Sequence, residues 1–462
     1  MEDKKYFTDI VIIGAGLTGL TIAYYLNKEK KNFIVLEKNE RAGGVINTVN
    51  DSHFIYEEGP NTGVISNASV VNIFEELSGK CNIEIADKNV GKRYVLKNGK
   101  WNALPIGLID AISTPLFTFK DKLKLLKEPF CEKGKNPDEN LASLVKRRIG
   151  TSFLNYAIDP FVLGVYAGDP SKLITKYSFP KLYNLEQKYG SFIWGAVKLM
   201  LKRKTPDEKK ISKKVFSCTG GMSSLINALH KSIGKNKVLL NFNDCRIGKT
   251  EDGFVVYGNN KSNDIEIHSK IIVTTIGAYN LNNKLLPFIA SEKLKQINSL
   301  HYTKVIEIIV GFKLWKGIKT DAFGGLIPFV ENKNLLGILF ISSLFKQRAS
   351  ESGALFSVFM GGVRKEEIVD FPDDDIYKII EKEFNALMLC TPFNPDLFKI
   401  IRHHKAIPQY GTESKNRLSA IEELQNKYNG LILSGNIRDG IGMADRIKQG
   451  KEIAENIISR IS

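Results

Sequence analysis

Residues 9–19 read DIVIIGAGLTG, and this stretch decides how the chain begins to fold. Its first five residues are a short apolar run, which is typical of a strand buried on both faces of a parallel sheet. The glycines that follow permit a tight turn, a close approach of backbone to a pyrophosphate, and close packing of helix on strand. A second apolar run, FIVL at 33–36, completes a strand–helix–strand unit close to the first residue.

The glycine motif predicts a dinucleotide site. The N-terminus of the following helix would face the phosphates with free N–H groups and the positive end of the helix dipole. Glu37, at the tip of the second strand, has the spacing of an acid that binds ribose hydroxyls. Such an acid disfavours NADP but does not separate NAD from FAD. The pair Gly43–Gly44 suggests a second backbone approach to the same extended dinucleotide, which favours FAD; a plain hairpin turn is the alternative.

The composition is that of a multidomain globular protein. The chain has 462 residues, of which 43% are hydrophobic, so two or more cores are expected. No apolar run is long enough for a membrane-spanning helix, and the charged N-terminus lacks a signal or transit pattern. The five cysteines contain no CxxC pair and the six histidines are scattered, so no disulfide framework, zinc site or other metal is expected. We therefore expect a cytoplasmic protein, either free or peripheral on the inner face of the cytoplasmic membrane.

The net charge of +16 leaves several partners open. A basic surface suits nucleic acid, anionic lipid or an acidic substrate. No helix-turn-helix, zinc-finger or aromatic RNA-binding signature accompanies the charge, so no nucleic-acid partner is expected. The alternative is an ordinary solvated surface.

Strand and helix patterns alternate along the chain. Residues 106–214 indicate helices, whereas strand patterns return from 216 onward. Residues 302–313, 335–343 and 354–361 predict a second, largely antiparallel sheet. The C-terminal piece, 430–458, predicts a strand, a glycine-rich turn and a helix. Strand–turn–helix units at both ends indicate one nucleotide-binding domain assembled from separated segments.

Several longer motifs identify a family. The chain resembles the oxygen-dependent protoporphyrinogen/coproporphyrinogen oxidases, within the flavin amine oxidase superfamily, over nearly its whole length. The matching segments are LEKNERAGGVINT at 36–48, EEGPN at 57–61, DPFVLGVYAGDPSKL at 159–173, LYNLEQKYGS at 182–191, FSCTGGMSSLINAL at 216–229, AIPQYG at 406–411 and GNIRDGIGMADRIKQG at 435–450.

The resemblance implies an α/β fold with a discontinuous Rossmann-like FAD-binding domain, a mixed α+β substrate domain and a helical capping or membrane-facing domain. Residues 1–90, 215–280 and 425–462 would form the FAD-binding domain. Residues 91–214 would be the helical domain, and 281–424 the substrate-side sheet.

The resemblance also implies an activity. The expected reaction is FAD-dependent oxidation of protoporphyrinogen IX to protoporphyrin IX, with molecular oxygen as acceptor and hydrogen peroxide as product, in haem biosynthesis. Coproporphyrinogen III is the alternative substrate. A flavin amine oxidase or desaturase and a catalytically silent tetrapyrrole carrier are further alternatives. Hand-over to the next haem-pathway enzyme and peripheral membrane contact through 106–119 are open partner predictions.

The family pattern assigns site residues one by one. Arg93 would bind a substrate propionate, because its planar fork pairs with a carboxylate. Leu326, Leu339 and Phe359 would enclose the macrocycle, and Gly164 and Gly168 would let backbone approach it. No catalytic acid or base is assigned. The expected cofactor-binding residues are Gly14, Ala15, Gly16, Leu17, Thr18, Gly19, Glu37, Lys38, Arg41, Gly43, Gly44, Gly59, Pro60, Asn61, Thr62, Asp244, Gly435, Ile441, Gly442 and Met443.

The departures from the family pattern are at Asp244, His403, Thr412 and the segment GMA at 442–444. Asp244 stands where relatives usually have a valine whose backbone meets the adenine. His403 stands where many have a tryptophan beside the flavin. Lys304 resembles the lysine of amine oxidases, but Glu307 is in better register with it, so we expect Lys304 to be an edge-strand charge.

Overall fold

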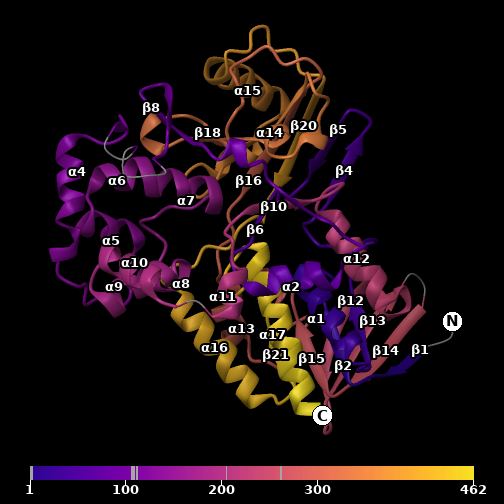
Figure 1. Cartoon of the computed structure of the whole chain (residues 1–462). Helices are drawn as coiled ribbons and strands as arrows, with labels where there is room; N and C mark the ends of the chain where they lie inside the picture. Colours follow the sequence, from indigo (N-terminus) through magenta and orange to yellow (C-terminus); the bar gives the residue numbers. More distant parts are fainter. Residues whose placement is uncertain (1–3, 106–109, 111–112, 204, 261–262, 462) are drawn as a thin grey trace.

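A computed structural model describes residues 4–105, 110, 113–203, 205–260 and 263–461. The chain forms three lobes around a central region (Figure 1). The lobe at the lower right of the figure contains the two ends of the chain, the helical lobe lies at the left, and the lobe built on the largest sheet lies at the top.

A five-stranded parallel sheet holds the first lobe together, and its strands come from distant parts of the sequence. Ile10 and Ile12 face one side, against α1 (Leu17–Lys28), α12 (Ser223–Ile233) and α17 (Met443–Ile461). Val11 and Ile13 face the other side. In spatial order the strands are β11 (Val238–Leu239), β3 (Phe33–Leu36), β2 (Ile10–Ile13), β15 (Ile271–Thr274) and β21 (Leu431–Leu433). The Rossmann-like sheet assembled from separated segments is thereby confirmed.

Smaller elements cover this sheet. A four-stranded sheet lies beside its second face, with α13 (Ser291–Asn298) and α16 (Ser414–Lys427). That sheet contains β1 (Lys4–Phe7), β14 (Asn263–Ser269), β13 (Phe254–Asn260) and β12 (Phe242–Lys249). The first lobe also holds the sheet β6 (Gly63–Val64), β10 (Val215–Cys218) and β7 (Ile83–Ile85), and α2 (Ala68–Glu76). The hairpin β4 (Thr48–Asp51) and β5 (Phe54–Glu57) packs instead on the upper lobe, where Phe54 and Tyr56 contact the cluster of Ile309 and Leu355.

A seven-stranded sheet forms the upper lobe, and α15 (Asp373–Met388) packs on one of its faces through Ile376, Ile380 and Phe384. Its spatial order is β20 (Leu397–His403), β16 (Val305–Phe312), β19 (Ala354–Gly361), β18 (Leu335–Phe340), β17 (Gly324–Leu326), β8 (Arg93–Lys97) and β9 (Lys100–Ala103).

Two of these strands come from a segment that we expected to be helical. β8 and β9 lie within 91–214 but extend the seven-stranded sheet, because β8 pairs with β17. Asn98 and Gly99 join them with φ of 53° and 71°, the positive values that a two-residue hairpin requires. The helical segment therefore begins after β9.

The helical lobe has its own apolar core around Leu141, Val145 and Val162. A buried ion network adds to it, since Arg148 lies 2.7 Å from both Glu128 and Glu186. None of the helices that the structure describes is both long and apolar enough to cross a membrane. The helices are α4 (Phe119–Leu126), α5 (Leu141–Arg148), α6 (Thr151–Phe153), α7 (Asp159–Tyr166), α8 (Thr175–Ser178), α9 (Pro180–Tyr189), α10 (Phe192–Leu201) and α11 (Pro206–Lys210).

Candidate active site

The N-terminus of α1 borders open space at the end of β2. Gly16 caps the helix without a side-chain hydrogen bond, so the first N–H groups of α1 have no capping side chain. A Cβ added to Gly16 would meet no atom within 4 Å, and one added to Gly44 would meet only the Cα of Gly16, at 3.4 Å. A side chain at either position would therefore fill a cradle beside a helix N-terminus, which fits the phosphates of a dinucleotide.

Glu37 lies beside this cradle. Its carboxylate accepts hydrogen bonds from Ala15 N at 2.9 Å and Asn39 N at 3.0 Å, and its side chain is buried. Arg41 donates to the carbonyls of Ile46 and Gly44, both at 2.9 Å, and so holds the glycine pair in place. The position of Glu37 fits an acid that binds a ribose, whereas Lys38 is exposed.

The remaining expected cofactor residues continue from the cradle toward the seven-stranded sheet. A Cβ on Gly59 would lie 2.1 Å from the carbonyl of Val45, so this segment packs directly on the residue after Gly44. A Cβ on Gly63 would lie 2.9 Å from the Met443 side chain, which brings 59–63 beside 441–443. Gly435 lies at the end of β21 against the backbone of Thr275. These segments thus lie next to one another, in an arrangement that fits one extended dinucleotide.

Asp244 lies farther out. It is exposed, has φ of 52°, and stands in a bulge of β12 between Asn243 and Arg246. Its carboxylate accepts from Asn259 at 2.8 Å, so its side chain is used within the four-stranded sheet and leaves only its backbone for the expected contact.

Four of the expected substrate residues share one face of the seven-stranded sheet. Directly paired residues point to the same face, and so do residues two apart on a strand. Leu326 pairs with Gly337, which pairs with Phe359. These directly paired residues form a row across the strands. In the next row, two residues away along β17, Leu339 pairs with Gly324 and Gly324 pairs with Arg93. The opposite face packs on α15, so the Arg93 face is turned toward the other two lobes.

The three large apolar residues of this face are half-exposed. In β17, β18 and β19, Leu326, Leu339 and Phe359 are the residues that are not buried, and every other residue of these strands is buried. In a strand whose other residues are buried, a large apolar side chain stays partly exposed only where no other part of the chain packs over it. The three residues therefore lie on one face of the sheet with part of each side chain accessible, although each also packs against a different apolar cluster.

The two expected glycines have different neighbours. A Cβ on Gly164 of α7 would lie 2.3 Å from the Leu326 side chain, so Gly164 lets α7 approach this apolar face. A Cβ on Gly168 would lie 2.5 Å from the amide oxygen of Gln409. The close packing at Gly168 is therefore against Gln409, and the structure brings only Gly164 to the expected macrocycle residues.

Arg93 lines a cavity of about 410 Å³ at the other end of the apolar face. The other lining residues are Gly91, Leu104, Pro105, Phe117, Phe153 and Ala157. The guanidinium lies over the ring of Phe323, 5.1 Å from its centre, and no carboxylate pairs with it within the described part of the chain. An apolar cavity with one accessible guanidinium suits an apolar ligand that carries a carboxylate.

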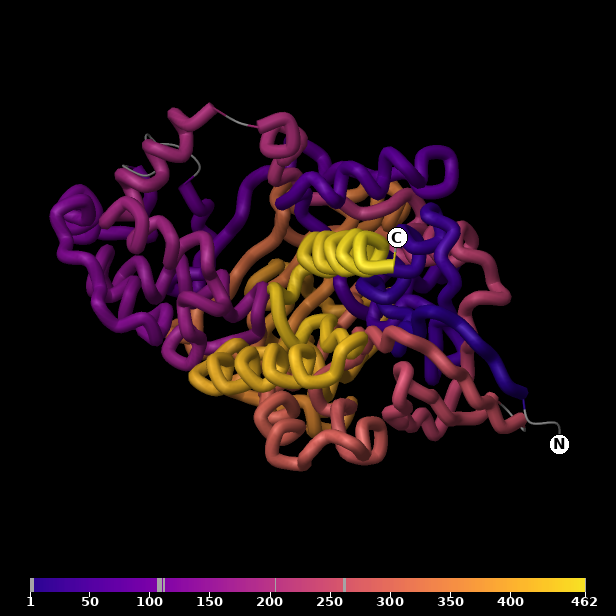
Figure 2. The backbone as a smooth tube through the Cα atoms, turned by 90° about the horizontal axis from the view of Figure 1, so that it is seen from below, coloured from indigo at the N-terminus to yellow at the C-terminus, as the bar shows by residue number. Residues whose placement is uncertain are grey.

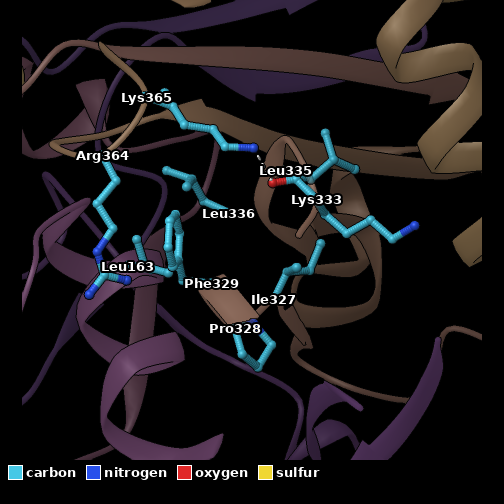
Figure 3. A pocket seen from close by; sticks show the side chains of 10 residues that line it. Leu163, Ile327, Pro328, Phe329, Lys333, Leu335, Leu336, Arg364 and Lys365 are labelled. Atoms are coloured by element: carbon cyan, nitrogen blue, oxygen red, sulfur yellow. Dashed lines mark hydrogen bonds between the residues drawn. The ribbon is translucent and has the colours of Figure 1, made fainter. Parts of the chain in front are cut away.

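A second, much smaller cavity lies beside Arg364 (Figure 3). Arg364 pairs with Asp159 at 2.6 Å and with Asp169 at 2.9 Å, and its guanidinium lies over Phe329. Lys365 donates to the carbonyl of Lys333. Because Arg364 is already paired with two carboxylates, this cluster joins α7 to the seven-stranded sheet.

The structure also brings together polar residues that the sequence assignment separated. Asn61 donates to Glu307 of β16 at 2.6 Å and accepts from Ser357 of β19 at 3.0 Å. His403 of β20 lies 3.8 Å from the same carboxylate. A charged residue in the otherwise apolar run VIEIIVGF was the signal for Glu307. Lys304 is not an edge-strand charge, so that expectation was wrong. Lys304 precedes β16, which pairs with a strand on each side, and its ammonium group pairs with Asp370.

Comparisons with known proteins agree on the kind of protein. The family model for flavin containing amine oxidoreductases matches residues 17–458. Protoporphyrinogen oxidase of Nicotiana tabacum mitochondria is 29% identical, over 99% of this chain and 96% of the relative. Coproporphyrinogen III oxidase of Bacillus subtilis (strain 168) is 26% identical, over 99% of each chain. A crystal structure from Exiguobacterium sp. 255-15 has the same fold, with a TM-score of 0.79, 21% identity and 99% coverage of both chains.

Proposed function

The chain belongs to the flavin containing amine oxidoreductase family, and from this premise we propose that it oxidises a porphyrinogen to the porphyrin. It is an FAD-dependent oxidoreductase. Protoporphyrinogen IX is the proposed substrate, coproporphyrinogen III is the alternative, and oxygen is the proposed acceptor. The names of the tobacco and Bacillus relatives support both substrates.

The row of half-exposed apolar residues carries this proposal. A porphyrinogen is a bulky, largely apolar macrocycle with propionate groups on one side. Leu326, Leu339 and Phe359 offer an apolar surface of neighbouring side chains, and Arg93 stands in the next row of the same face. A small amine would need neither so broad a surface nor a guanidinium.

The protein's part in the reaction is to bind and orient. Bound FAD supplies the two-electron oxidation and the reaction with oxygen. Gly16, Gly44 and Glu37 would hold its ADP half, and residues 59–62 and 441–443 would adjoin the flavin ring. Arg93 would orient the macrocycle by one propionate, which sets the carbon that faces the flavin.

Parallel kinetics on the two porphyrinogens test the proposal. Purified enzyme is mixed with each substrate under oxygen, and porphyrin fluorescence, oxygen uptake and peroxide are followed. We expect a porphyrin yield well above the spontaneous rate, with one peroxide for each two electrons removed. If neither substrate is oxidised faster than without enzyme, the proposal is wrong. A higher kcat/KM for coproporphyrinogen III would select the alternative substrate.

We further propose that the helical lobe contacts the cytoplasmic face of a membrane. Phe119 and Leu126 of α4, Phe130 after it, and Met200 and Leu201 of α10 are largely exposed. Large apolar side chains among lysines suit an interfacial site. The expected anchor 106–119 lies partly outside the described residues, namely at 106–109 and 111–112. Flotation with anionic liposomes at low and high salt tests this contact, and no binding at low salt would contradict it.

A further inference from the structure

Glu307 is a buried carboxyl group with polar partners from three different segments. Its exposed fraction is 1%, in a strand whose other residues are also buried. Asn61 donates to one carboxyl oxygen from the segment 59–62, and Asn61 in turn accepts from Ser357. Burying a carboxyl group is costly, and these few hydrogen bonds offset only part of the cost. A buried carboxyl group that keeps only a few polar partners is a candidate for a chemical role.

His403 gives this carboxyl group a second, titratable neighbour. Its Nε2 atom is buried, lies 3.8 Å from Glu307 Oε2 and has no hydrogen-bond partner within the described residues. The His403 side chain is 24% exposed, so the ring reaches from the buried carboxyl group to solvent. The adjacent His404 lies 3.9 Å from Asp370 at the surface. A buried ring nitrogen without a partner beside a carboxyl group suits proton exchange.

The position of Glu307 joins the two halves of the candidate site. Glu307 pairs directly with Phe359, so it belongs to the same row as Phe359 and Leu326 on the open face. On its other side Asn61 belongs to the segment expected to adjoin the flavin ring. Figure 1 shows β16 and β20 at the boundary between the upper lobe and the dinucleotide-binding lobe. Glu307 thus lies between the apolar substrate surface and the cofactor segment.

We propose that Glu307 is the proton acceptor of porphyrinogen oxidation, with Asn61 positioning its carboxyl group and His403 connecting it to solvent. This inference rests on the proposed function. In each two-electron step a C–H bond of a bridging methylene breaks and the hydride goes to the flavin. The N–H bond of a neighbouring pyrrole breaks, its electron pair stays to form the new double bond, and its proton forms an O–H bond with Glu307.

The proton is needed again in the same cycle. Oxygen takes the two electrons and the transferred hydrogen, and one further proton completes hydrogen peroxide. Glu307 returns that proton directly or by exchange through His403, so each step converts one oxygen to one peroxide with no net gain or loss of protons. A group that stores a proton between two half-reactions needs an affinity for protons above that of an exposed carboxyl group.

The electrostatics of the cluster agree with such storage. Burial raises the pKa of Glu307 above its ordinary value, and the interactions with His403, Asn61 and Ser357 oppose the rise. Of the three residues that face it from β20, the 59–62 segment and β19, only His403 has a side chain that can both accept and release a proton. The carboxylate form is required to accept a proton, so flavin reduction should slow as the pH falls through the raised pKa of Glu307.

Two measurements on the FAD-loaded enzyme and its Glu307→Gln variant test the proposal. The first is the rate of anaerobic flavin reduction by protoporphyrinogen IX as a function of pH. The second is independent of activity: the infrared band of a protonated carboxyl group is followed in the resting enzyme as the pH is varied. We expect Glu307→Gln to slow reduction about 100-fold, the usual contribution of a general base, and to remove both the acid limb and the titrating band.

Two control variants distinguish proton transfer by Glu307 from a purely structural contribution of its side chain. Ser357→Ala removes a hydrogen bond to Asn61 but no titrating group, so it should keep the acid limb and the band. Glu307→Asp should retain an acid limb at a lower rate, and it serves if the glutamine variant does not fold. An unchanged band, or reduction by Glu307→Gln within about threefold of wild type and with the same pH profile, would overturn the proposal. A wild-type enzyme that oxidises neither porphyrinogen would instead refute the proposed function.

Discussion

The two large sheets of the molecule offer ligand contacts in different ways. The five-stranded sheet is covered on both faces, and its candidate site lies at the strand ends, where Gly16 and Gly44 offer backbone. The seven-stranded sheet is covered on one face by α15, and its candidate site is the other face, where Phe359 and Leu326 offer side chains. At a backbone site an added side chain occupies the space of the ligand, whereas at a side-chain site a substitution removes one contact and leaves the others.

The largest effect on ligand binding is expected at the backbone site. Gly16 has extended backbone angles that any residue adopts, and a Cβ there meets open space. Gly16→Val should therefore fold but project into the phosphate cradle, and we expect at least a 100-fold weaker affinity for FAD, about 2.7 kcal/mol. Flavin absorbance per protein, together with circular dichroism, measures this.

Gly19→Ala provides the contrast. Its Cβ would lie 2.0 Å from the carbonyl oxygen of Gly14, so the turn itself must change. We expect loss of both FAD and thermal stability in Gly19→Ala, but loss of FAD alone in Gly16→Val. If the Gly16→Val enzyme is purified with a full complement of FAD, Gly16 does not border the phosphate site.

The two faces of the second sheet can be compared within one strand. Phe356 of β19 is fully buried among residues of α15, whereas Phe359 is half-exposed on the open face. Phe356→Ala should cost about 3–5 kcal/mol of unfolding free energy. Phe359→Ala should cost far less stability but raise KM for the porphyrinogen about tenfold, as expected for one lost apolar contact. Urea unfolding measures the stability of both variants, and steady-state kinetics measure their KM. Equal losses of stability would contradict the assignment of Phe359 to an open face of the sheet.

Two arginines near this sheet allow a similar comparison. Arg364 pairs with two carboxylates, so Arg364→Ala should destabilise the fold by about 3 kcal/mol, with KM little changed. Arg93 lines the large cavity, so Arg93→Ala should leave the melting temperature within a few degrees and raise KM about tenfold or more. If the KM for the porphyrinogen is unchanged in Arg93→Ala, Arg93 does not bind a propionate.

The smallest expected effect depends on pH. The Arg364 guanidinium and the Ser171 hydrogen bonds outweigh burial and hold the pKa of Asp169 at about 2, below its usual 3.8. A depressed pKa contributes stability above about pH 4, and this is lost as the pH falls toward 2. Asp169→Asn should therefore lower the unfolding free energy by about 2 kcal/mol at pH 6 and by less at pH 3. Asp374→Asn, at an exposed position on α15, is the control for the removal of one carboxylate.

Sequence reasoning succeeded where the pattern was local. The strand, glycine turn and helix at residues 10–28 follow from adjacent residues. It failed where the partner was remote. β8 and β9 were assigned to the helical segment, because nothing within residues 91–103 indicates that β8 pairs with β17, more than two hundred residues away. Glu307 received no role, because its partners Asn61 and His403 lie far from it in sequence.

The sequence by itself determined the dinucleotide-binding unit and the family, because both depend on short-range spacing and on motifs that are read one after another. Only the tertiary structure decided that Arg93, Leu326, Leu339 and Phe359 share one face, since the face of a strand residue depends on which strands pair and in what register. The same folding decided the fate of each charge. Arg364 is neutralised by carboxylates from the helical lobe, Arg93 is left open to a cavity, and Glu307 is buried beside a histidine.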